Sequence, residues 1–224
     1  MSNSVNRISR YGGFVNAFLV VEDDGLTLID TTTPRGGKKI LAGAAKLDAP
    51  IVRVALTHAH GDHIGSLDEV ADALPGVEVI ISAREARFLD KDMSLDPGEP
   101  EDELRGGWPG ARTRPTRTVQ PGDMIGSLEV IASPGHTPGH VAFLDRRDGT
   151  LYAGDALSTL GGMATPAKPR RVFPLVASAT WHKPLALDSA RALSALDPAR
   201  LATGHGKVVE SPGPAMDAAI ARSS

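Results

Sequence analysis

Four side chains that can bind a metal ion fall within six consecutive positions, His58, His60, Asp62 and His63, directly after the apolar segment 51–56. The apolar segment has the length and composition of a buried strand, and the residues that follow the motif have helical periodicity. His58 and His60 are two residues apart, so in extended backbone they project to the same side. Asp62 and His63 lie where the chain turns into the helix. The motif therefore predicts a site at a strand end, with two pairs of side chains that can face two adjacent ions.

The absence of cysteine narrows the chemistry of this site. With no cysteine among 224 residues, the chain has no disulfide, no thiolate nucleophile and no sulfur ligand for zinc or iron. Any metal ion must therefore be held by imidazoles and carboxylates.

Composition indicates an ordinary globular chain. Hydrophobic residues make up 41% and charged residues 23% of the sequence, and no Ser/Gly linker divides it, so we expect one domain over residues 1–224. The net charge is −3, and no run of Lys or Arg is longer than two, which argues against a nucleic-acid partner. Residues 1–10 are polar, and no segment of about 18 apolar residues occurs. We expect a cytoplasmic protein with a small-molecule substrate and no membrane partner.

Strand and helix patterns alternate along the chain. Short β-rich segments predict strands at residues 14–21, 26–30, 51–56, 77–81, 127–133, 141–145, 150–153 and 200–203, the first two joined as a hairpin. Helical spacing predicts helices at residues 38–47, 63–74, 185–196 and 212–221, and a short helix from Ser82, which has the capping-box spacing to Glu85. Residues 90–115 and 158–178 are irregular. This order predicts two mixed sheets packed together with helices outside.

Three further candidate ligands lie in glycine-bearing loops after predicted strands. His136 lies in the segment 133–140, Asp155 follows Gly154, and His205 lies between Gly204 and Gly206. Loops at strand ends are common positions for functional groups. A single histidine is usually a packing or surface residue, but this many imidazoles and carboxylates without a metal would leave buried polar groups with few partners.

These segments together resemble the metallo-β-lactamase-fold hydrolase superfamily. Residues 57–63 match its defining motif, residues 134–140 its second histidine loop, Gly154-Asp155 its bridging aspartate and Gly204-His205-Gly206 its last ligand, in the right order over nearly the whole chain. The resemblance implies an α+β fold, the four-layer αββα sandwich, with the site at one edge of the two sheets. It also implies that His58, His60 and His136 bind one ion, that Asp62, His63 and His205 bind the other, and that Asp155 bridges them.

The implied cofactor is a pair of divalent ions, zinc by preference, with manganese and iron as alternatives. Two such ions about 3.5–4 Å apart make a bridging hydroxide at neutral pH and polarise a substrate carbonyl. Asp62 is then a ligand first and a proton carrier second. Behind the ligands, Asp30 resembles the family's aspartate that supports the first histidine pair, although a turn-forming role is equally consistent with its sequence context. We expect His140 to be a buried hydrogen-bonding residue and not a further ligand.

Differences from individual subfamilies favour a hydrolase of small esters, thioesters or lactones, similar to glyoxalase II and lactonases. Class B1 β-lactamases use a cysteine ligand and class B3 enzymes lack the bridging aspartate, so β-lactam hydrolysis is at most a minor activity. Lactonases usually carry a tyrosine where this chain has Ser158, and only a short segment follows His205, where glyoxalase II has a helical domain. A persulfide dioxygenase would use a single iron held by His58, His136 and Asp155, and it remains the alternative.

Substrate-contacting residues have no motif in this sequence. We expect specificity to reside in residues 90–115 and 158–178, where Trp108 and Phe173 either line a substrate cleft or fill a minor core. The oligomeric state has no sequence signal.

Overall fold

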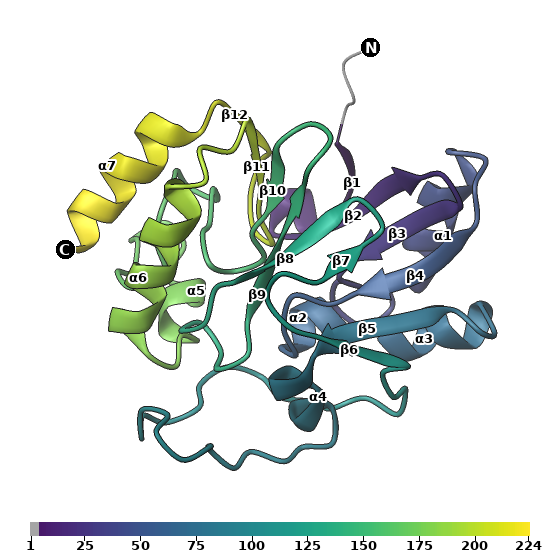
Figure 1. Ribbon diagram of the computed structural model, residues 1–224, viewed down its shortest axis with the longest axis horizontal. Coiled ribbons are helices and arrows are strands. Elements are labelled where there is room, and N and C mark those ends of the chain that lie inside the picture. Colours follow the sequence, from purple (N-terminus) through teal and green to yellow (C-terminus); the bar gives the residue numbers. More distant parts are fainter. Residues whose placement is uncertain (1–4) are drawn as a thin grey trace.

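Two six-stranded sheets form the centre of the computed structural model, which describes residues 5–224 (Figure 1). In spatial order, the first sheet contains β1 (Asn6–Arg10), β2 (Val15–Glu22), β3 (Gly25–Ile29), β4 (Ile51–Ala55), β5 (Glu78–Ser82) and β6 (Arg117–Val119). The second contains β12 (Val209–Glu210), β11 (Arg200–Ala202), β10 (Thr150–Tyr152), β9 (Val141–Asp145), β8 (Leu128–Ala132) and β7 (Met124–Ile125).

Both sheets are mixed. In the first, β1, β2 and β3 are antiparallel, with Leu19 opposite Leu28, which confirms the predicted hairpin, and β3 to β6 are parallel. In the second, neighbours are antiparallel except β10 and β11. The parallel strands place their carboxyl ends, and the loops that follow them, along one edge of each sheet.

A hydrophobic core fills the space between the sheets, where Phe18 and Ile80 of the first sheet pack in one cluster with Phe143 and Tyr152 of the second. A second cluster lies between the first sheet and helices α1 to α4, and a third lies between the second sheet and helices α6 and α7. Burial of each such aliphatic or aromatic side chain contributes about 1.5–3 kcal/mol to folding. The layers are therefore helix, sheet, sheet, helix, which confirms the predicted α+β sandwich.

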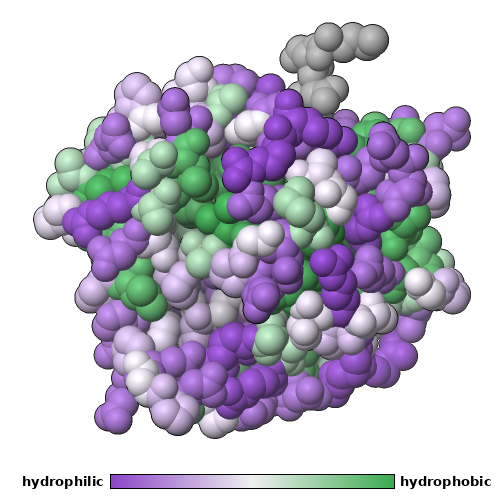
Figure 2. Space-filling model, in the orientation of Figure 1, coloured by the Kyte–Doolittle hydropathy of each residue, from purple (hydrophilic) through white to green (hydrophobic). Residues whose placement is uncertain are grey.

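The helices cover the outer faces of the sheets (Figure 1). Their bounds are α1 (Gly37–Ala45), α2 (Gly61–Ile64), α3 (Leu67–Ala73), α4 (Ala83–Leu89), α5 (Leu175–Ser178), α6 (Lys183–Ser194) and α7 (Gly213–Ser223), with a 3₁₀ turn at Tyr11–Gly13. In the orientation of Figure 1, the outer surface is largely hydrophilic, with hydrophobic patches between the polar side chains (Figure 2). None of the helices within residues 5–224 is both long enough and apolar enough to cross a membrane.

The prediction of one helix over residues 63–74 is wrong, because the chain forms α2 and α3 with Gly65 and Ser66 between them. A side chain at Gly65 would collide with Pro34, which packs directly against it. The Ser66 hydroxyl donates to the Thr33 carbonyl and accepts from the Gly36 amide at 2.7 Å each. These tertiary contacts with the segment after β3 interrupt the helix.

Candidate metal centre

All seven predicted ligands lie at one edge of the sandwich, in segments that follow strands. His58 and His60 follow β4, and Asp62 and His63 belong to the short helix α2. The other three lie after strands of the second sheet: His136 after β8, Asp155 after β10 and His205 after β11. Both sheets therefore contribute side chains to one place. Six of the seven are buried; Asp62 is partly exposed.

The first group contains His58, His60 and His136, whose ligand atoms lie within 4.8 Å of one another. In each ring one nitrogen is already held: His58 Nδ1 by Thr57 Oγ1 at 3.0 Å, and His136 Nδ1 by Thr180 Oγ1 at 3.0 Å. His60 Nε2 lies 2.9 Å from the Arg105 carbonyl oxygen. The remaining nitrogens point inward, with His60 Nδ1 only 3.1 Å from His136 Nε2.

The second group contains Asp62, His63 and His205, also within 4.8 Å. His63 Nδ1 lies 2.8 Å from Asp30 Oδ2, and His205 Nδ1 contacts the Phe14 carbonyl oxygen. His205 Nε2 lies 3.4 Å from Asp62 Oδ2.

Asp155 lies between the two groups. Its Oδ2 is 3.1 Å from His205 Nε2 and 3.5 Å from His136 Nε2, and its Oδ1 is 3.3 Å from His63 Nε2. One carboxylate thus contacts imidazoles of both groups.

The donor set fits divalent cations. Within residues 5–224, His58 Nε2, His63 Nε2 and Asp155 Oδ1 are buried without a hydrogen-bond partner. Leaving a buried polar atom unpaired costs about 1–3 kcal/mol, and imidazoles that bind metal commonly have their second nitrogen held by a protein group, as here. Cations bound between these inward-facing atoms would satisfy them.

A sequence profile described as metallo-beta-lactamase superfamily matches residues 10–205, the span that carries this cluster. The chain belongs to this superfamily of metallo-hydrolases. It is 44% identical over 207 residues to the uncharacterized protein YobT of Bacillus subtilis (strain 168), covering 92% of this chain and 89% of that one. It is 28% identical over 199 residues to the hydroxyacylglutathione hydrolase GloC of Haemophilus influenzae (strain ATCC 51907 / DSM 11121 / KW20 / Rd), covering 85% of each chain. The crystal structure of TTHA1623 in a di-iron-bound form has the same fold, with a TM-score of 0.67, 24% identity, and coverage of 93% of this chain and 96% of that one.

The pKa values of the imidazoles divide the cluster of predicted ligands into two halves. Burial lowers the pKa of His58 and His136 well below the ordinary value and lowers that of His60 to about 4. In the other half, burial acts in the same direction, but Asp155 and Asp62 together outweigh it and raise the pKa of His205 to about 10. Asp155 and Asp30 likewise raise the pKa of His63. Without metal, protons on His63 and His205 therefore balance the buried carboxylates.

Metal loading is expected to release at least two protons at pH 7, one each from His63 and His205, because a ligating imidazole must be neutral while these two start protonated. Ionisation of a metal-bound water to hydroxide would add a third. The apparent metal affinity should consequently increase with pH from neutrality up to about 10, the pKa of His205. Calorimetric titrations of the metal-free protein in two buffers with different heats of ionisation measure the number of protons released. Heats that do not depend on the buffer would contradict this charge assignment.

Asp30 and His140 lie directly behind the cluster. Asp30 contacts His63, and it reaches His58 only through Thr57, whose backbone N–H and hydroxyl both donate to the Asp30 carboxylate. His140 is buried, with Nδ1 2.8 Å from Ser133 Oγ, and its Nε2 accepts from the Asp155 backbone N–H at 3.1 Å. Asp30 therefore orients the imidazole of His63, a predicted ligand, and His140 positions the backbone of Asp155.

Glu85 is a fully buried carboxylate behind the cluster. From the sequence, we predict only a capping-box role for it. The Ser82 hydroxyl does cap α4 by accepting from the Glu85 N–H, but the Glu85 carboxylate does not reach back to Ser82. It accepts from the Ala59 N–H at 2.9 Å, the Thr137 hydroxyl at 2.6 Å and the Gly139 N–H at 2.9 Å. Burial raises the pKa of Glu85 to about 7 against these hydrogen bonds. Glu85 therefore joins the first histidine motif to the His136 loop.

Replacing Glu85 by glutamine is expected to lower the free energy of unfolding by about 1–3 kcal/mol. The NH₂ group of the glutamine side chain is a donor, and it would face an N–H or O–H donor that now binds a carboxylate oxygen. Because both loops carry ligands, metal affinity should fall by about 10–100-fold. Urea denaturation and competition with a chelator measure the two effects. Glu129→Gln, at a partly exposed ion pair with Arg146, is the matched control and should change neither quantity appreciably. Unchanged metal affinity in Glu85→Gln would contradict the role.

The irregular segment 90–115 forms one side of the site. The Gly107 carbonyl accepts from the Gly61 N–H at 2.9 Å, and a Cβ on Gly106 would overlap the ring of His60. Trp108 packs between His60 and Phe88, with ring centroids 4.3 and 4.5 Å away, so it is largely a packing residue. A pocket of about 80 Å³ lies over the cluster between this segment and α5.

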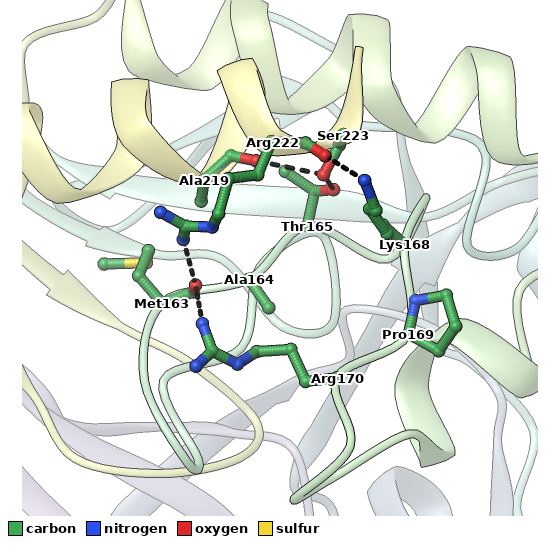
Figure 3. Close-up of a pocket in the computed structure, with 9 residues that line it drawn as sticks. All are labelled: Met163, Ala164, Thr165, Lys168, Pro169, Arg170, Ala219, Arg222 and Ser223. Atoms are coloured by element: carbon green, nitrogen blue, oxygen red, sulfur yellow. Dashed lines mark hydrogen bonds between the residues drawn. The ribbon is translucent and has the colours of Figure 1, made fainter.

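A larger cavity of about 530 Å³ lies elsewhere, between the segment 163–170 and α7 (Figure 3). Arg170 and Arg222 both donate to the Met163 carbonyl oxygen, and Lys168 donates to the carbonyl oxygen of Arg222. None of the seven predicted ligands lines it. Its cationic groups already have partners, so the small pocket over the imidazoles is the candidate reaction site.

Proposed function

We propose that this metallo-hydrolase binds two divalent cations and hydrolyses a small ester, thioester or lactone. The observation that carries the proposal is the position of Asp155, within 3.5 Å of imidazole nitrogens in both ligand groups. His58, His60 and His136 would hold one ion, Asp62, His63 and His205 the other, and Asp155 would be shared. The similarity to GloC, a hydroxyacylglutathione hydrolase, supports the thioester class.

When bound, two divalent cations supply a nucleophilic hydroxide at neutral pH and a Lewis acid for the carbonyl. The side chains of this protein then have distinct tasks. Thr57, Thr180 and the Arg105 carbonyl hold one nitrogen of each imidazole in the first group, and Asp30 and the Phe14 carbonyl do so in the second. Asp62 is a ligand whose partly exposed carboxylate can also accept a proton and pass it to the leaving group. His63 lowers the pKa of Asp62 against the effect of burial, so this carboxylate is ionised at neutral pH.

Zinc is the proposed metal. Manganese and iron are the alternatives, because imidazole and carboxylate ligands also bind them. Of the two alternatives, iron should be tested first, because TTHA1623, whose fold is similar, has a di-iron-bound form. A persulfide dioxygenase with one iron on His58, His136 and Asp155 would leave Asp62, His63 and His205 without a metal, although these three converge as closely as the first group.

Elemental analysis of purified protein, combined with a substrate panel, tests the proposal. Two metal ions per chain are expected, with chelator-sensitive hydrolysis of nitrophenyl esters, acyl-CoA thioesters or homoserine lactones and little or no turnover of nitrocefin. One iron per chain with oxygen uptake would reject the hydrolase in favour of the dioxygenase.

A further inference from the structure

One wall of the pocket over the metal cluster is apolar. Phe173, which lies just before α5, and Leu175 and Val176, in the first turn of α5, line this pocket together with His205. The Phe173 ring lies 5.1 Å from the His205 ring, so the wall begins at the ligands of the second group. On the His60 side the lining is formed by the backbone of Gly106 and Gly107, which has no apolar side chain.

Further exposed apolar side chains lie on the same segment or contact it. Val172 is 75% exposed and Leu175 59% exposed, and Phe14 is 49% exposed with its ring edge-on to Phe173 at 5.7 Å. Phe14 also contacts His205 through its carbonyl oxygen. Large apolar side chains that adjoin one another in water mark a surface that contacts a ligand or partner. Because this surface is continuous with the pocket, its occupant is the part of the substrate next to the reacting carbonyl.

The size of the pocket determines which part of a substrate can contact the apolar wall. The space over the cluster is about 80 Å³, against about 10–15 Å³ of such space for one water molecule. It therefore holds a carbonyl group and few further atoms. Anything longer must extend outside this space, where the exposed hydrocarbon of Leu175 adjoins it.

We infer that Phe14, Val172, Phe173, Leu175 and Val176, together the acyl wall, bind an apolar acyl chain of the ester, thioester or lactone substrate. The inference rests on the proposed hydrolase function and narrows its substrates to those whose acyl chain extends beyond the pocket over the metal cluster. Polar acyl groups gain nothing from this surface, because burial of hydrocarbon is its source of affinity.

A chain-length series tests the acyl wall in the metal-loaded protein. p-Nitrophenyl acetate, butyrate and octanoate share a leaving group, so kcat/KM divided by the rate of spontaneous hydrolysis reports on the acyl chain. This quantity should increase about tenfold or more from acetate to octanoate. Leu175→Ser and Val172→Ser should each reduce the octanoate-to-acetate ratio to about threefold or less. Val21→Ser and Met124→Ser, at side chains 48% and 45% exposed on β2 and β7, should leave it unchanged.

Binding of the carboxylate products separates this inference from the proposed function. Octanoate should bind the metal-loaded protein about tenfold more tightly than acetate in calorimetry, and Leu175→Ser should remove most of the difference. Chelator-sensitive hydrolysis with no chain-length preference, or an unchanged ratio in Leu175→Ser, overturns the acyl wall and leaves the hydrolase intact. Absence of any ester hydrolysis together with Leu175-dependent octanoate binding rejects the hydrolase and retains the wall.

Discussion

Asp155→Ala is expected to reduce turnover of any substrate by about a thousandfold or more and to lower the metal content from two ions per chain to one or none. The carboxylate contacts His136 in one predicted ligand group and His63 and His205 in the other, so its loss would remove a donor from both proposed ions at once. The experiment compares kcat/KM for the best nitrophenyl ester with metal stoichiometry measured by elemental analysis.

Asp145→Ala is the matched control for this substitution. Asp145 is also a buried aspartate, but it lies on β9 and pairs with Arg147, away from the cluster. This variant should lose stability but keep two metal ions and most of its turnover. Full activity in Asp155→Ala would refute the bridging role.

Asp30→Ala is expected to lower the free energy of unfolding by about 3–5 kcal/mol, the range for removing one partner of a buried charged pair. The Asp30 side chain accepts from the Thr57 N–H at 2.8 Å and the Thr57 hydroxyl at 2.9 Å, and it faces His63 Nδ1 at 2.8 Å. The backbone of Asp30 has φ 58°, a left-handed conformation that aspartate and asparagine tolerate better than alanine. Urea denaturation of the metal-free protein gives the change directly.

Asp30→Asn separates the charge of Asp30 from its shape. Asparagine keeps the backbone preference and an acceptor for Thr57 but loses the negative charge opposite His63, so a smaller loss of about 1–3 kcal/mol is expected. A change below about 0.5 kcal/mol in Asp30→Ala, the usual range for a surface substitution, would show that the carboxylate does not hold these groups in solution.

The ligand cluster could be predicted because its signals are local. His58 to His63 directly follow a buried strand, and Asp155 and His205 follow adjacent parallel strands, whose carboxyl ends meet at one edge of a sheet. The sandwich could be predicted for the same reason, from the strand and helix patterns and their order. The ligand roles themselves stay predictions until metal is measured.

Features that depend on distant contacts could not be predicted. Glu85 shows only a capping spacing in the sequence, whereas its partners Ala59 and Thr137 are 26 and 52 residues away. The break between α2 and α3 arises from the segment around Pro34. The sequences of β1, β6 and β12 have no strand pattern of their own. β6 and β12 are only three and two residues long, and each forms because a neighbouring strand supplies the hydrogen bonds.

The predicted ligands come from segments that follow strands of both sheets: His58, His60 and His63 follow a strand of the first, and His136, Asp155 and His205 follow strands of the second. Ions held among them would cross-link the two halves of the sandwich, and ligand binding to the native state alone raises its stability. We therefore expect metal starvation to shorten the lifetime of this protein in the cell, because chains without ions would unfold and meet proteases more often. Its abundance would then follow the supply of metal even where its synthesis does not change.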